Sequence, residues 1–100
     1  MFGVVGVRSS GTLRRCLRQR KSVDGQMAIL IGALGPLREN DIVGYLRKVG
    51  VSPNRTRGVM ACLSKTSAYE RLVGQHSDGR WYLESAGQDW YRQEIGGDPI

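Results

Sequence analysis

The sequence is poor in the residues that most enzymes and metal proteins use for chemistry. It has one histidine, His76, and two cysteines, Cys16 and Cys62, which lie 46 positions apart. A zinc site, a CxxC redox pair and a disulfide-dense secreted scaffold each need more of these residues at closer spacing, so none is expected. No second histidine or thiol lies near His76, which excludes most catalytic triads and metal-dependent reactions.

Long apolar runs are also absent. No stretch approaches the ~18 to 20 apolar residues that a membrane-spanning helix needs, so an integral membrane protein is excluded and no membrane partner is expected. The chain has 100 residues, of which 40% are hydrophobic and 24% are charged. That composition is ordinary for a globular protein, and the length fits one small domain with a modest core.

Positive charge is present but unevenly distributed. Residues 1–23 contain six basic side chains and no acid, and this segment accounts for the net charge of +6. The remaining 77 residues are neutral, yet five basic residues and no acid lie between Asp41 and Glu70. A neutral domain with one basic stretch has a directional field, which favours docking to a polyanion through one face. The alternative is a solvated charged face with no partner.

Residues 1–25 form a basic segment that begins with scattered glycines and serines. It shows no clear helical or strand period, so we expect a disordered arm. Three interpretations stay open: an extension that reaches a phosphate backbone, a transit-like segment rich in arginine, or sequence upstream of a start at Met27. The charges follow the short apolar stretch, which does not fit a secretory signal.

Three helices are predicted in the first part of the folded region. Residues 26–34 are apolar on nearly all sides, as in a buried helix. A second amphipathic helix begins near Asn40, and Gly50 is placed to close it in the left-handed conformation. Ser52 and Pro53 then form an N-cap and first-turn pair for a third helix over residues 53–65.

The third helix is predicted to bury one face and expose another. The buried face is centred on Val59, with Thr56, Met60 and Leu63 beside it. The outward face contains polar or basic ends separated by small side chains: Asn54, Arg57, Ala61, Ser64 and Lys65. A helix of this kind fits the ~12 Å width of a DNA major groove. Gly58, in mid-helix, either allows a close approach or is a tolerated imperfection.

Beyond the third helix the hydrophobic period changes to two. Residues 70–75 and 80–84 are predicted to be strands, and Asp78-Gly79 between them predicts a type I′ hairpin. Ser85 and Gln88 match a capping box that starts a last helix ending near residue 95, before a tail over residues 96–100. Trp81 and Trp90 are interpreted as core aromatics, Cys62 as a small core residue, and Cys16 as an incidental thiol in the arm.

This order of elements resembles the winged helix-turn-helix family over residues 26–95. The resemblance depends on NDIVGYLRKVGVSPNRTRGVMACL, which is similar to two helices joined by a Gly-Val-Ser turn, and on LVGQHSDGRWYLESAGQDW, which is similar to a wing and the entry to a closing helix. It implies an α+β winged helix whose third helix enters the major groove while the wing touches the DNA backbone. The positions that it nominates for DNA binding are Asn54, Arg55, Arg57, Ala61, Ser64, Lys65, His76 and Arg80.

Side-chain chemistry gives these positions different roles. Arginine bonds guanine O6 and N7 bidentately, so Arg57 is interpreted as a base reader, while Asn54 suits adenine. Arg55, Lys65 and Arg80 are interpreted mainly as phosphate contacts. His76 is most simply an exposed turn residue. If about five basic groups engage phosphates, log affinity should fall with log salt at a slope of about −4 to −5.

We therefore expect a cytoplasmic or nucleoid-associated protein that binds double-stranded DNA, as a transcriptional regulator and as a monomer or weak homodimer. The alternatives are a winged-helix module that binds another protein, and an architectural or recombination factor of a mobile element. No enzymatic activity or cofactor is expected, because the sequence contains no phosphate-cradling glycine loop and its carboxylates are scattered over predicted exposed faces.

Overall fold

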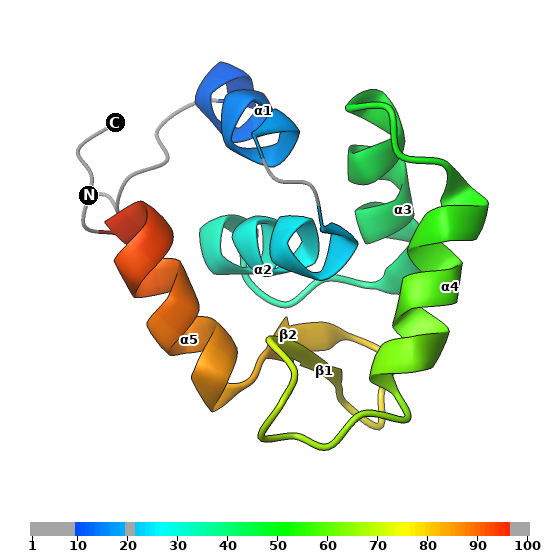
Figure 1. The fold of residues 1–100 in the computed structure, drawn as a ribbon. Helices are drawn as coiled ribbons and strands as arrows, with labels where there is room; N and C mark the ends of the chain where they lie inside the picture. Colours follow the sequence, from blue (N-terminus) through cyan, green and yellow to red (C-terminus); the bar gives the residue numbers. More distant parts are fainter. Residues whose placement is uncertain (1–9, 20–21, 97–100) are drawn as a thin grey trace.

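The structure of this chain is a computed structural model that describes residues 10–19 and 22–96. The described residues form five α-helices, one π-helical turn and a two-stranded antiparallel sheet (Figure 1): α1 (Ser10–Arg18), α2 (Val23–Leu34), α3 (Glu39–Lys48), α4 (Pro53–Leu63), β1 (Val73–Gln75), β2 (Trp81–Leu83), α5 (Ser85–Tyr91) and η1 (Arg92–Gly96). The predicted α+β class is confirmed.

Helix α2 is the centre of the molecule. It contacts α1, α3, α4, α5 and both strands, and Met27, Ile29 and Leu30 are completely buried. A helix that is apolar on all sides is stable only when neighbours cover every side, as the sequence predicted for residues 26–34. Gly35 ends α2 with a φ of 89°, a value that side chains with a β-carbon rarely adopt.

Helix α1 corrects the prediction of a disordered arm over residues 1–25. Leu13, Cys16 and Leu17 recur at helical spacing and are buried, while Arg15 and Arg18 are exposed. The side-chain amide of Gln26 in α2 donates a hydrogen bond to the Leu17 carbonyl at 2.9 Å. A nine-residue helix is marginal alone, so packing on α2 stabilises it.

Helix α1 covers only part of the predicted arm. Residues 1–9 and 20–21 lie outside the described residues, as do residues 97–100 of the predicted tail. Helix α2 already begins at Val23, three residues before the predicted start of the folded region. In Figure 1, α1 lies on one side of α2 and the hairpin lies on the other.

The connection between α3 and α4 follows the sequence prediction closely. Gly50 adopts a φ of 93° two residues after the end of α3, and its N–H donates to the Arg47 carbonyl at 3.1 Å. The Ser52 hydroxyl accepts a hydrogen bond from the Arg55 N–H at 3.2 Å, with Pro53 in the first turn of α4. The predicted N-cap and closing glycine are confirmed, because each supplies the partner or conformation that a helix end requires.

The hairpin is shorter than predicted and is held by a third segment. Gln75 pairs with Trp81 and Val73 with Leu83. On the other edge of β2, Leu37 from the α2–α3 linker exchanges two backbone hydrogen bonds with Trp81, at 2.7 and 3.1 Å. Trp81 is buried, which confirms its prediction as a core aromatic, and Trp90 packs partly buried against the core.

The turn type predicted for this hairpin is wrong. A type I′ turn needs positive φ at both central residues, but only Gly79 has it, at 94°. The His76 N–H donates to the Arg80 carbonyl at 2.8 Å and the Gly79 N–H donates to the His76 carbonyl at 2.9 Å. These bonds close a three-residue loop, in which a type I turn precedes one left-handed glycine, so that Asp78 keeps a negative φ.

The capping box predicted at Ser85 is also absent. Ser85 is the first residue of α5, the N-cap position belongs to Glu84, and no side chain caps this end. The Glu84 carboxylate instead pairs with Arg71, while the Gln88 amide donates to the Leu83 carbonyl at 3.4 Å. The first turn of α5 packs closely on the segment before β1, because a β-carbon at Gly87 would overlap the carbonyl oxygen of Leu72.

Candidate nucleic-acid interface

The buried face of α4 determines which of its side chains point outward. Thr56, Met60 and Leu63 are buried, as predicted, and the Thr56 hydroxyl donates to the Ser52 carbonyl at 3.3 Å. Val59 is only partly buried, so the buried face is centred nearer Thr56 than the predicted Val59. Contacts with α2 and α3 hold the helix in this orientation.

The outward face of α4 is the one that the sequence predicted. Every residue assigned to it is exposed, but only Asn54, Arg57 and Ala61 lie on α4 itself. The helix ends at Leu63 and not at the predicted residue 65, so Ser64 and Lys65 lie in the turn that follows. Arg55 and Gly58 are exposed as well. No acidic side chain lies on α4, and the small residues keep its backbone close to the surface. This face can therefore approach a polyanion closely over the length of the helix.

Cys62 is exposed, which corrects its prediction as a core residue. Six residues beyond Thr56, it lies about 120° around the helix from the centre of the buried face. The carbonyl of Cys62 accepts a hydrogen bond from the Thr66 hydroxyl at 2.9 Å, and the Ala61 carbonyl accepts one from the Ser64 hydroxyl at 2.7 Å. These bonds satisfy carbonyls at the end of α4 that have no partner within the helix.

Arg57, the predicted base reader, is paired in this structure. Its Nε donates to Oε2 of Glu39, in the first turn of α3, at 3.3 Å. The two side chains are 49% and 46% exposed, and exposed pairs contribute only about 0–1 kcal/mol. The pair therefore orients the Arg57 side chain, and breaking it costs little free energy. Because the partners lie 18 residues apart on different helices, no sequence spacing reveals the pair.

Arg80, the predicted wing contact, is also paired. Its guanidinium lies 2.9 Å from Oδ2 of Asp78, and its backbone N–H donates to Oδ1 at 3.0 Å. The hydrogen bonds from the Arg80 backbone and side chain hold the pKa of the Asp78 carboxyl below its ordinary value. The Asp-Gly-Arg order in a turn is a sequence signal for this pair that the prediction missed.

His76 lies at the opposite end of the same loop. It is exposed, as expected of a turn residue, and its ring stacks on Tyr82 with centroids 4.0 Å apart and planes at 16°. The predicted site residues thus fall into two groups: one on the outward face of α4, and a second, His76 and Arg80, flanking the hairpin loop.

Two exposed tyrosines were not among the predicted site residues. Tyr69, between α4 and β1, is 91% exposed. Tyr45 on α3 is partly exposed, with the Lys48 ammonium 5.8 Å from its ring centroid. A basic and aromatic pair beside a basic helix suits sugar and phosphate contacts. The sequence signal was available, since Tyr45, Arg47 and Lys48 lie on the polar side of the predicted second helix.

Other classes of site find no support in the described part of the chain. Residues 10–19 and 22–96 contain no group of three histidine, cysteine or acidic side chains arranged to hold a metal ion. Within the same ranges, none of the helices has the length and apolar character needed to cross a membrane. Comparisons with protein-family models, curated proteins and solved structures found no match to this chain.

Proposed function

We propose that this chain is a DNA-binding protein of winged helix-turn-helix type, acting as a transcriptional regulator. The observation that supports it most directly is the outward face of α4. That face, together with Ser64 and Lys65 just beyond the helix, is exposed and basic, α4 itself has no acidic side chain, and its small residues allow a duplex to approach the helix backbone.

The arrangement of the other elements supports the same proposal. Helices α3 and α4 are joined by a short turn, and α2 packs beneath both. The segment at Leu37 pairs with β2 of the hairpin, as a short first strand pairs in a winged helix. In such an arrangement α4 enters the major groove, and the hairpin loop approaches the adjacent backbone.

The proposed contacts divide into reading and positioning. Arg57 exchanges the Glu39 carboxylate for the O6 and N7 atoms of a guanine, and Asn54 contacts an adenine. Arg55, Lys65 and Arg80 contact phosphates and set the register of the helix on the duplex. Arg80 does this while it is bound to Asp78, which lowers the net charge that it brings to the backbone.

Selection of bound sequences from a random duplex pool, followed by fluorescence anisotropy titration, tests the proposal. We expect binding whose log affinity falls with log salt at a slope of about −4 to −5. Arg57→Glu and Arg55→Glu should abolish it. Arg92→Glu, at an exposed arginine paired with Asp89 on the far end of the chain, is the matched control and should bind normally.

Two results would remove the proposal: no binding to any duplex at low salt, or equal losses for Arg57→Glu and the Arg92→Glu control. The second candidate function is docking to a protein partner, which the exposed Tyr69 and the ion-paired state of both Arg57 and Arg80 favour. A partner held by the Tyr69 segment would be lost on Tyr69→Ala and retained on Arg57→Glu, the reverse of the pattern expected for DNA.

A further inference from the structure

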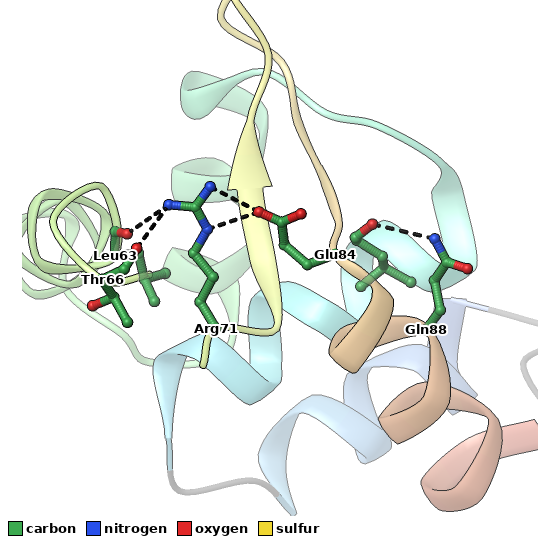
Figure 2. Close-up of polar contacts among 6 residues, drawn as sticks. Leu63, Thr66, Arg71, Glu84 and Gln88 are labelled. Carbon is green, nitrogen blue, oxygen red and sulfur yellow. Dashed lines mark hydrogen bonds and ion pairs between the residues drawn. The ribbon is translucent and has the colours of Figure 1, made fainter. Parts of the chain in front are cut away.

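The side chain of Arg71 connects three separate segments at the base of the hairpin (Figure 2). Its Nη1 donates to the carbonyls of Leu63 and Thr66, each at 3.1 Å. Its Nε and Nη2 lie 2.8 and 2.7 Å from Oε2 of Glu84. One guanidinium therefore joins the end of α4 to the segment that follows β2.

Burial distinguishes this ion pair from three other pairs of the described residues. The Arg71 and Glu84 side chains are 18% and 12% exposed, whereas the pairs made by Arg57, Arg80 and Arg92 leave nearly half or more of each side chain exposed. A pair withdrawn from water is screened less by salt. Removing one partner would leave the other charge desolvated and unpaired.

The surrounding backbone is shaped to admit this pair. A β-carbon at Gly74 in β1 would overlap the Glu84 carboxylate and would lie 3.1 Å from Nη2 of Arg71. The Glu84 N–H donates to the Leu72 carbonyl at 2.9 Å, so the backbones beside both charged residues are also joined. Glycine in a strand interior weakens the strand, and here it makes room for the ion pair.

The donor geometry of Arg71 suits arginine alone. The carbonyls at the C-terminal end of α4 lack partners within the helix and carry partial negative charge. A planar guanidinium bonds these carbonyls from one edge and the carboxylate from another, whereas a lysine ammonium is a point donor that cannot span both. The contact therefore fixes the angle between the end of α4 and the segment after β2, as well as the distance between them.

We propose that Arg71, bound to Glu84, is a positioning residue that sets the orientation of the hairpin relative to α4, so that both contact one duplex at the same time. The duplex contact rests on the proposed function, while the orientation does not. Arg71 itself is only partly exposed, and it acts through Arg80 on the hairpin and the outward face of α4.

A distance measurement without DNA tests the orientation. Cys62 on α4 is an exposed native thiol and accepts a spin label; Ser77→Cys supplies a second site on the hairpin loop, in a Cys16→Ala background. We expect a narrow distance distribution that broadens or shifts in Arg71→Lys. Glu84→Gln, which keeps a side chain of the same size, should broaden it too. Arg92→Lys is the matched control and should leave it unchanged.

A fall in thermal stability with an unchanged distance distribution would overturn the proposal, because that result means a purely structural pair. The DNA contact is tested by a double-mutant cycle. Arg80→Ala should weaken binding in the native background and lose its effect when Arg71 is lysine. Equal losses in both backgrounds would overturn this part. Failure of all duplex binding would remove the proposed function, yet the label distances would still decide the orientation.

Discussion

Nε of Arg57 and Oε2 of Glu39 lie 3.3 Å apart and link the outward face of α4 to the first turn of α3. The arginine proposed to read bases is therefore held by a carboxylate before any duplex arrives. In the proposed function, binding exchanges one acceptor for another, so the contribution of Arg57 to the affinity is the difference between two arginine contacts.

Glu39→Gln should tighten DNA binding by roughly 2- to 5-fold at low salt, because an exposed pair stabilises the free protein by at most about 1 kcal/mol and the carboxylate also repels phosphate. The stability to unfolding should change by less than ~0.5 kcal/mol. Asp89→Asn, which releases Arg92 in the same way, is the control with unchanged affinity. Weaker binding by Glu39→Gln would show that Glu39 orients Arg57 productively.

Gly58→Ala should stabilise the free protein and weaken its binding to DNA. A β-carbon at Gly58 would meet no atom within 4 Å, and alanine in an exposed helix interior is favoured over glycine by roughly 0.5 to 1 kcal/mol. The glycine is then explained by the close approach of a duplex. Gly44 on α3 also has no atom within 4 Å of an added β-carbon, so Gly44→Ala should raise the stability by a similar amount without a loss of affinity for DNA. Unchanged binding by Gly58→Ala would mean that Gly58 is merely tolerated.

Tyr91→Phe should remove a loss of stability at alkaline pH. Burial, and secondly the neighbouring Cys16, raise the pKa of the Tyr91 hydroxyl above its ordinary value of 10.0. The unfolded chain ionises this group first, so the group leaves the stability unchanged below pH 10 and lowers it as pH rises through the folded-state pKa. Urea unfolding measured between about pH 8 and about pH 11, on both sides of the ordinary tyrosine pKa of ~10, follows the change in stability.

At neutral pH the same variant should be as stable as the native protein, or up to ~1 kcal/mol more stable. The Tyr91 hydroxyl is buried without a hydrogen-bond partner among the described residues, while its ring packs on Gly32. Tyr45→Phe on α3 is the control and should keep the alkaline loss. A pH profile of Tyr91→Phe that matches the native one would assign the loss to another group.

The two thiols should differ sharply in reactivity. Cys62 is exposed on α4, whereas Cys16 is buried between α1 and the core. A thiol reagent should label Cys62 alone in the native protein and both cysteines in denaturant. In Cys62→Ala the remaining thiol should react only as fast as α1 opens. Equal labelling rates for both thiols would show that α1 does not pack on α2.

Local signals predicted most of the helices and their ends. The apolar run of residues 26–34, the Gly50 closing residue and the Ser52-Pro53 start are each decided within a few residues of sequence, and all three are confirmed. The outward face of α4 was also correct, because helical spacing alone separates it from Thr56 and Met60.

Two of the errors arise from dependence on distant partners. Helix α1 was missed because nine residues rich in arginine gain stability from tertiary contacts such as those with α2. The capping box failed because Glu84 and not Ser85 takes the N-cap position of α5, and the Glu84 carboxylate pairs with Arg71, 13 residues earlier. The DNA-binding role of the predicted site remains a prediction.

The packing of α1 also bears on how the basic segment should be studied. Truncation at Met27 would remove most of the chain's net charge, but it would also strip Leu13, Cys16 and Leu17 from α2 and leave an apolar helix uncovered. A shortened protein that failed to bind DNA would then report misfolding or aggregation as readily as lost electrostatics. Substituting the exposed Arg15 and Arg18 within the intact chain separates the effect of charge from that of the fold.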